Sequence, residues 1–161
     1  LDVLATAMHA GMKANMLKDL DLAYAPPFSS AKDPVNMAGF MIENIRNGFV
    51  KQYHWDEIAG LPRDGSVTLL DTRTAYEYKS GHIDGYINIP VDDLRERMNE
   101  IDDSKPVYVI CQSGLRSYIA CRILTQNGFD CYNFSGGYRF YASVIKEKEM
   151  SEYTYPCGME K

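Results

Sequence analysis

The fold of this chain is decided by one stretch of its sequence, Val107-Tyr108-Val109-Ile110-Cys111-Gln112-Ser113-Gly114-Leu115-Arg116-Ser117. Its first four residues are apolar or aromatic and predict a short buried strand that ends at Cys111. A helical apolar pattern resumes over residues 117–124, directly after the loop. The stretch therefore predicts a strand–loop–helix unit of an α/β fold, with a cysteine at the junction.

This predicted position of Cys111 suits an anionic sulfur. The N-terminus of a helix presents free backbone N–H groups, and the helix dipole favours negative charge there. Gly114 allows the loop to curl so that N–H groups point at one atom, and Arg116 adds a fixed cation for an oxyanionic substrate. We therefore predict that Cys111 is a nucleophilic thiolate. The alternative is a buried cysteine that only ends a core strand.

The surrounding sequence alternates strand and helix patterns, which predicts a parallel sheet with helices on both faces. The predicted strands are residues 67–71, 86–90, 107–110 and 129–134, and the predicted helices are residues 55–58, 74–78, 91–101, 115–127 and 138–147. Ligands of such sheets bind at the carboxyl ends of the strands. Asp71 and Cys111 both end predicted strands, so we expect them at the same edge.

The first part of the chain has a different character. It predicts helices at residues 1–10 and 35–47, a short helical or turn stretch at residues 16–22, and no strand. The helix at residues 35–47 follows Asp33 as N-cap and Pro34 at the first helical position. We expect three parts: a mainly helical segment, residues 1–48; an α/β domain, residues 49–150; and a loose tail, residues 151–161. The chain begins at Leu1 rather than Met, which suggests a piece of a longer protein. An exposed apolar helix from Val35 to Ile45 predicts self-association through the first segment.

Composition excludes several classes of partner and site. The net charge is −5 and no run of Lys and Arg occurs, so nucleic acid is not expected as the main partner. No apolar run is long enough for a membrane span, and no metal site is expected, because the histidines are scattered and the cysteines show no CxxC spacing. We expect Cys121 to be a core residue and Cys157 a bystander, in a protein of the reducing cytoplasm.

The number of residues between Cys111 and Arg116 separates two chemistries. Tyrosine phosphatases and arsenate reductases also place a cysteine and an arginine on such a loop, but with five residues between them. Here four intervene, Gln112 to Leu115. The smaller ring matches the extra sulfur atom of a persulfide better than a phosphate, and no aspartic general acid is evident. Sulfur transfer is favoured, with a Cys-dependent phosphatase or arsenate reductase as the alternative.

Six pieces of sequence, in order and spacing, resemble a single rhodanese (sulfurtransferase) domain over residues 50–148. They are Asp71-Thr72-Arg73-Thr74, Glu77-Tyr78, Gly81-His82-Ile83, Asn88-Ile89-Pro90, the stretch from Cys111 to Ser117, and Gly136-Gly137. The resemblance implies that Cys111 takes a sulfane sulfur from thiosulfate, polysulfide or a persulfide and passes it to a thiol acceptor, while Arg116 binds the anionic part of the donor. The residues expected to bind the sulfur or its donor are Gln112, Ser113, Gly114, Leu115, Ser117 and Asp71.

Residues 1–47, above all Tyr24 to Asn36, resemble the end of the dimerisation domain of coenzyme A disulfide reductases, which are FAD-dependent pyridine nucleotide-disulfide oxidoreductases. The resemblance implies that the chain is the C-terminal part of such a fusion, with FAD, NAD(P)H and coenzyme A used by the full-length protein. Tyr24 matches a tyrosine that, in these reductases, reaches the thiol site of the partner subunit. The alternative is an aromatic ring that only packs beside Pro26 and Pro27. The chain itself contains no Gly-rich dinucleotide fingerprint, so no cofactor is expected in it. A sulfur-binding or docking module without turnover is the alternative function.

Two further expectations concern the residues around the loop. Arg73 and Glu77 are four residues apart at a predicted helix start, so we expect them to pair. Asp71 either orients the loop or satisfies backbone donors. His82, between Gly81 and Ile83, is interpreted as a hydrogen-bonded turn residue rather than a base.

Overall fold

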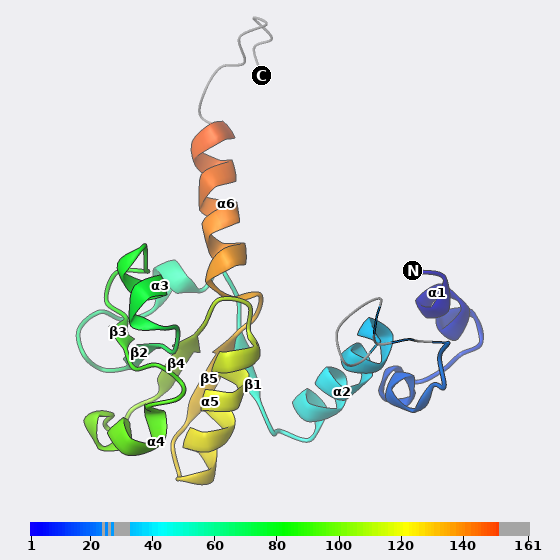
Figure 1. Cartoon of the computed structure of the whole chain (residues 1–161), viewed down its shortest axis with the longest axis horizontal. Coiled ribbons are helices and arrows are strands. Elements are labelled where there is room, and N and C mark those ends of the chain that lie inside the picture. The colour runs from blue at the N-terminus through cyan, green and yellow to red at the C-terminus, as the bar shows by residue number, and fades with distance from the viewer. Residues whose placement is uncertain (24, 26, 28–32, 152–161) are drawn as a thin grey trace, which may run out of the picture. The chain divides into compact units, whose positions relative to one another are not determined.

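The computed structural model describes residues 1–23, 25, 27 and 33–151 (Figure 1). The chain divides into two compact units, Leu1–Phe49 and Val50–Lys161, and each is described by itself. The expected tail, residues 151–161, lies outside the described residues apart from Ser151, and so does Cys157.

The second unit is built on one five-stranded sheet in which every pair of neighbouring strands is parallel. The strand order is β1-β5-β4-β2-β3. The strands are β1 (Lys51–Tyr53), β2 (Thr68–Asp71), β3 (Ile87–Asn88), β4 (Val107–Ile110) and β5 (Cys131–Phe134). β4 lies at the centre, and its four residues are buried or half-buried because both faces of a parallel sheet are covered.

Helices cover both faces of this sheet, as the alternating sequence pattern predicts (Figure 1). They are α3 (Ala75–Lys79), α4 (Leu94–Arg97), α5 (Leu115–Gln126) and α6 (Gly137–Ser151). Alternate strand residues divide between two cores: Val107 and Val109 pack with α4 and α5, whereas Ile110 packs on the other face, where Tyr138 and Tyr141 of α6 lie. Cys121, on α5, is a core residue as expected, at 1 % exposure.

The first unit contains α1 (Asp2–His9), a 3-10 helix at Ala14–Asp19 and α2 (Pro34–Arg46). The predicted cap of α2 is confirmed, because the side chain of Asp33 accepts a hydrogen bond from the N–H of Val35. Asn36 holds α2 to the 3-10 helix and the residue after it, because its Nδ2 donates to the carbonyl oxygens of Leu17 and Leu20, at 3.0 Å each.

Some elements differ from the sequence-based expectation. β1 was not predicted, because three residues of mixed polarity carry no period-2 pattern. The helix expected over residues 91–101 is instead α4 followed by a 3-10 helix at Met98–Glu100, since Arg97 leaves the helical conformation with φ −105° and ψ 11°. The helix expected over residues 55–58 is a turn followed by a 3-10 helix at Ile58–Gly60.

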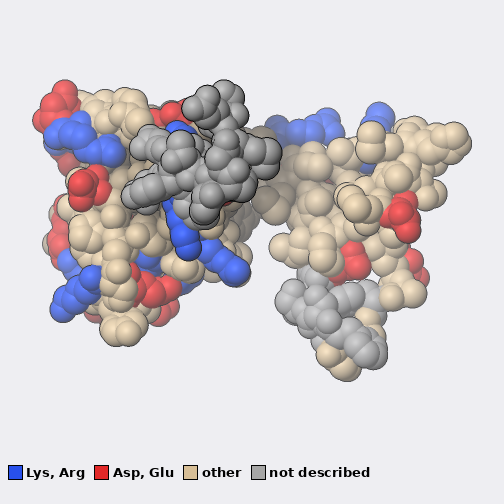
Figure 2. Space-filling model, turned by 90° about the horizontal axis from the view of Figure 1, so that it is seen from above, with Lys and Arg blue, Asp and Glu red and all other residues tan. Residues whose placement is uncertain are grey.

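Acidic and basic side chains are interspersed over the face drawn in Figure 2, which shows no continuous basic surface. Among the described residues, no helix is both long and apolar enough to span a bilayer.

Candidate functional site

Cys111 directly follows β4 and is fully buried. Its Sγ accepts a hydrogen bond from the N–H of Gly114 at 3.1 Å, and the hydroxyl of Ser117 donates toward the same sulfur at 3.2 Å. Gly114 has φ +102° and is the N-cap of α5, so the loop curls as the sequence predicts because glycine adopts this left-handed conformation. Two donors and a helix N-terminus therefore face one sulfur atom, an arrangement that stabilises negative charge on it.

The start of α6 holds this loop from the other side. The N–H of Tyr138 donates to the carbonyl oxygen of Cys111 at 2.7 Å, and the N–H of Arg139 donates to that of Gln112 at 3.1 Å. Gly137, at φ +69°, allows this approach, because a Cβ there would lie 2.5 Å from the nitrogen of Ser113 and 2.6 Å from the carbonyl oxygen of Gln112. The cysteine loop is thus positioned by two helices.

Arg116 pairs with Glu77 through two hydrogen bonds of 2.7 Å, one from each terminal nitrogen of the guanidinium. Glu77 also accepts from the N–H of Thr74, which completes the capping box of α3. The hydrogen bonds from Arg116 lower the pKa of Glu77 from 4.5 to about 2, and the same contact raises the pKa of Arg116. The expected pairing of Arg73 with Glu77 is wrong, because each has a partner elsewhere.

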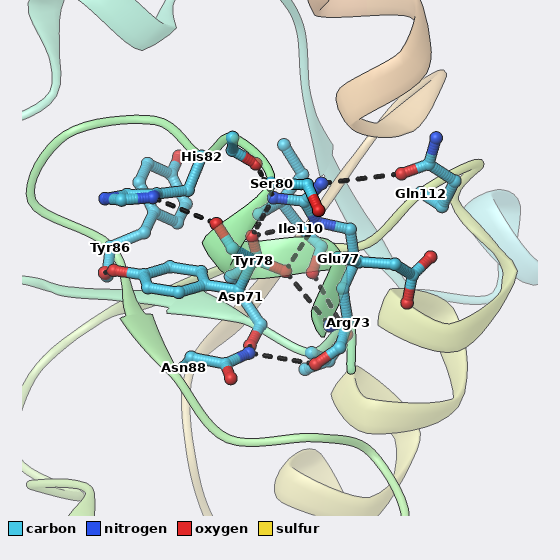
Figure 3. Close-up of polar contacts among 12 residues, drawn as sticks. Asp71, Arg73, Glu77, Tyr78, Ser80, His82, Tyr86, Asn88, Ile110 and Gln112 are labelled. Carbon is cyan, nitrogen blue, oxygen red and sulfur yellow. Dashed lines mark hydrogen bonds and ion pairs between the residues drawn. The ribbon is translucent and has the colours of Figure 1, made fainter. Parts of the chain in front are cut away.

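Arg73 pairs instead with Asp71, and both side chains are almost fully buried. Its Nε and one terminal nitrogen bond the Asp71 carboxylate at 2.7–3.1 Å (Figure 3). The guanidinium also donates to the carbonyl oxygen of Gly81 at 2.8 Å, approaches Oε1 of Gln112 at 3.5 Å, and lies 3.9 Å from the ring centroid of Tyr138. The Asp71 carboxylate therefore orients an arginine that connects β2 to the cysteine loop and α6.

The remaining predicted residues occupy different surroundings. Gln112 is half-buried beside Arg73, whereas the side chains of Ser113 and Leu115 are exposed at the turn into α5. Nδ1 of His82 bonds the carbonyl oxygen of Tyr78 at 3.1 Å, which agrees with a hydrogen-bonded turn residue. Tyr24 lies outside the described residues.

The sequence analysis does not predict two contacts of the cysteine loop, one from Asn133 and one from Tyr138. Nδ2 of Asn133, on β5, donates to the carbonyl oxygen of Gly114 at 3.4 Å. The visible signal was a polar residue at an inward position of a buried strand, two residues after Cys131. The bond from Tyr138 to the loop left no such signal, because it involves only the backbone.

The described residues offer no place for a metal ion or a dinucleotide at this edge. No group of three or more His, Cys, Asp or Glu in that part of the chain is arranged to bind a metal. The turn after β2 is filled by the buried Asp71–Arg73 pair, and the turn after β4 closes around Cys111. These turns therefore do not fit the pyrophosphate of FAD or NAD(P)H, which needs a glycine-rich turn.

Two solved structures resemble most of the chain. Reduced Bacillus anthracis CoADR-RHD is 46 % identical, with a TM-score of 0.85 over 91 % of this chain and 26 % of that chain. A NAD-dependent persulfide reductase from A. fulgidus is 38 % identical, with a TM-score of 0.72 over 86 % of this chain and 24 % of that chain. The chain therefore spans about a quarter of each protein.

A shorter relative and a family model match the second unit. The putative sulfurtransferase YtwF of Bacillus subtilis is 33 % identical over 85 residues, which cover 53 % of this chain and 82 % of the relative. The model of the rhodanese-like domain matches residues 54–143, the part that contains the sheet and the cysteine loop. Because this match covers more than half of the 161 residues, the chain belongs to the rhodanese-like domain family.

Proposed function

We propose that the second unit is a sulfurtransferase that carries sulfane sulfur on Cys111. The observation that carries the proposal is the environment of the sulfur: a fully buried Sγ that accepts from the N–H of Gly114 and the hydroxyl of Ser117. Donors fixed in this way stabilise an anion on the cysteine, and they suit a thiolate before the reaction and a persulfide after it.

The chemistry takes two displacements. The Cys111 thiolate attacks the outer sulfur of a donor such as thiosulfate, the S–S bond of the donor breaks, and sulfite leaves with the bonding electron pair. An acceptor thiol then attacks the outer sulfur of the Cys111 persulfide, which regenerates the Cys111 thiolate and leaves the acceptor as a persulfide. Arg116 contributes positive charge at the mouth of the loop, where its side chain is 30 % exposed while paired with Glu77.

For the full-length protein we propose an FAD- and NAD(P)H-dependent coenzyme A disulfide or persulfide reductase. The support is the similarity over 91 % and 86 % of this chain to CoADR-RHD and to a protein called a NAD-dependent persulfide reductase. The physiological acceptor would then be coenzyme A or a thiol of the larger protein. Free thiols at Cys111, Cys121 and Cys131 support a reducing compartment such as the cytoplasm.

The test combines intact mass with turnover. The full chain is treated with thiosulfate or polysulfide and weighed, and cyanide is then added as acceptor to measure thiocyanate formation. The wild type is expected to gain one sulfur atom on Cys111 and to turn over. Cys111→Ser should lose both properties, and Cys157→Ser serves as the control that keeps both.

The alternatives give different results. An unmodified wild type would contradict the proposal. A gain of sulfur without turnover would favour a sulfur-binding or docking module. Hydrolysis of an aryl phosphate that Cys111→Ser abolishes would favour a phosphatase.

A further inference from the structure

Asn133 presents a buried oxygen for which the structure gives no hydrogen-bond partner. This residue lies on β5, opposite Val109 of β4, and only 6 % of its surface is exposed. Its Oδ1 is buried without a partner among the described residues, although its Nδ2 donates to the carbonyl oxygen of Gly114. An acceptor left unpaired in a core destabilises the folded protein, so its presence needs a reason.

The orientation of the amide supplies that reason. If the Asn133 amide were rotated by half a turn, Oδ1 would face the carbonyl oxygen of Gly114, and two acceptors would repel each other. The bond to Gly114 therefore requires the orientation that leaves Oδ1 without a donor. The unpaired oxygen is thus the consequence of keeping a donor on the Gly114 carbonyl.

Three donors compete for this carbonyl. The N–H of Tyr118 lies 3.1 Å from it, the hydroxyl of Ser117 lies 3.1 Å from it, and Nδ2 of Asn133 lies 3.4 Å from it. A carbonyl oxygen has two lone pairs, so Tyr118 and Asn133 together satisfy it.

The hydroxyl of Ser117 has only one proton and two possible acceptors. One is the carbonyl oxygen of Gly114, and the other is Sγ of Cys111 at 3.2 Å. When the carbonyl already has two donors, the proton of Ser117 is available to the sulfur. A hydrogen bond to a charged acceptor is about twice as strong as one between neutral groups, so an anionic sulfur gains from this proton.

From these contacts we propose that Asn133 is a positioning residue, which binds the Gly114 carbonyl so that the Ser117 hydroxyl donates to the Cys111 sulfur. The inference rests on the proposed sulfur chemistry, because the anion that it stabilises is the Cys111 thiolate or persulfide. Asn133 acts through Gly114 and Ser117 and need not touch the substrate.

The test is a double-mutant cycle in the full chain, with Asn133→Leu, Ser117→Ala and the combination. The measured quantity is the rate of Cys111 alkylation by iodoacetamide at pH 6.5 divided by the rate at pH 9.5, read on the Cys111 peptide by mass spectrometry. The ratio cancels changes in access to the sulfur and reports stabilisation of the anion.

Asn133→Leu and Ser117→Ala are each expected to lower this ratio about fivefold, which corresponds to the loss of one hydrogen bond. The combination should lower it no further than Ser117→Ala alone, because Asn133 acts through that hydroxyl. Tyr132→Phe, on the same strand and the opposite face, is the matched control and should leave the ratio unchanged. Asn133→Leu also removes the unpaired oxygen, so its urea midpoint should stay close to that of the wild type.

An unchanged ratio in Asn133→Leu, or full additivity in the double variant, would overturn the inference. Alkylation needs no sulfur donor, so this result is independent of turnover. A wild type that takes up no sulfur refutes the proposed function alone, whereas normal uptake with an additive cycle refutes the role of Asn133 alone.

Discussion

At the scale of single residues, the pKa of Glu77 is shifted by its pairing with Arg116, so this pair makes stability depend on pH. Both oxygens of Glu77 bond Arg116, and the resulting pKa of about 2 lies well below the ordinary value of 4.5. A carboxyl whose folded pKa is lowered stabilises the protein fully above its unfolded value and loses this contribution as pH falls through the folded value. The contribution of Glu77 to the stability of the folded protein is therefore lost as the pH falls from about 4.5 to about 2.

Glu77→Gln tests this pH dependence. The neutral amide keeps an acceptor for the N–H of Thr74 but loses the ion pair, so we expect a loss of about 1 kcal/mol in the free energy of unfolding at pH 7. Urea denaturation at several pH values should show the difference from wild type shrinking between pH 4.5 and pH 2. A difference that stays constant over this range would contradict the assignment.

A second prediction at this scale concerns the close approach at Gly137. Gly137→Ala should abolish sulfur loading of Cys111, because the added Cβ collides with the backbone of the cysteine loop. Gly65→Ala is the matched control: it has φ +84° and nothing within 4 Å of its Cβ, so it carries only the left-handed strain of about 1–2 kcal/mol. Intact mass after thiosulfate compares the two variants. Equal loading in both would show that the loop does not depend on Gly137.

At the scale of elements, Arg73 joins segments that the sequence keeps apart. From the end of β2 it bonds Gly81, reaches Gln112 on the cysteine loop and lies against Tyr138 of α6. Breaking a buried ion pair costs more than an exposed pair contributes, because the remaining charge keeps its desolvation penalty.

Arg73→Lys is therefore expected to lower the free energy of unfolding by about 3 kcal/mol, since an ammonium cannot reproduce the bidentate contact. Arg97→Lys, at the exposed pair with Glu100, is the matched control and should leave stability essentially unchanged. Urea unfolding of the full chain measures both. Comparable effects of the two substitutions would refute the structural role of Arg73.

The elements also show where sequence patterns stop being sufficient. The strand–loop–helix unit around Cys111 and the capped start of α3 were predictable because their signals are local: an apolar run, a glycine and a capping threonine. The break in the helix expected over residues 91–101 was not, because Leu94 and Ile101 are seven residues apart and lie in one core, so their helical spacing gives no signal of a break between them.

At the scale of the whole molecule, the chain comprises two units, and the first exposes an apolar stripe on one of its helices. α2 of the first unit exposes Met37, Met41 and Ile45, each four residues from the next and therefore on one face of the helix. We propose that this stripe pairs with a second copy of the chain.

Multi-angle light scattering of the full chain is expected to give a dimer. Met41→Glu should shift it to the monomer, because a charge in an apolar contact is costly. Met8→Glu, at an exposed methionine of α1, is the control that should remain dimeric. A monomeric wild type would contradict self-association.

The sequence by itself determined the parallel α/β class and the placement of Cys111 between a strand and a loop that leads into a helix, because periodicity, glycine and spacing are properties of neighbouring residues. Only the tertiary structure decided which charges pair and which donors reach the loop. Glu77 and Arg116 are 39 positions apart in the sequence, and Asn133 and Gly114 are 19 positions apart. Such contacts follow from the strand order β1-β5-β4-β2-β3, which brings β5 and the turn after β2 to opposite sides of β4. Sequence patterns contain no direct signal for that order, because it arises from packing between distant segments.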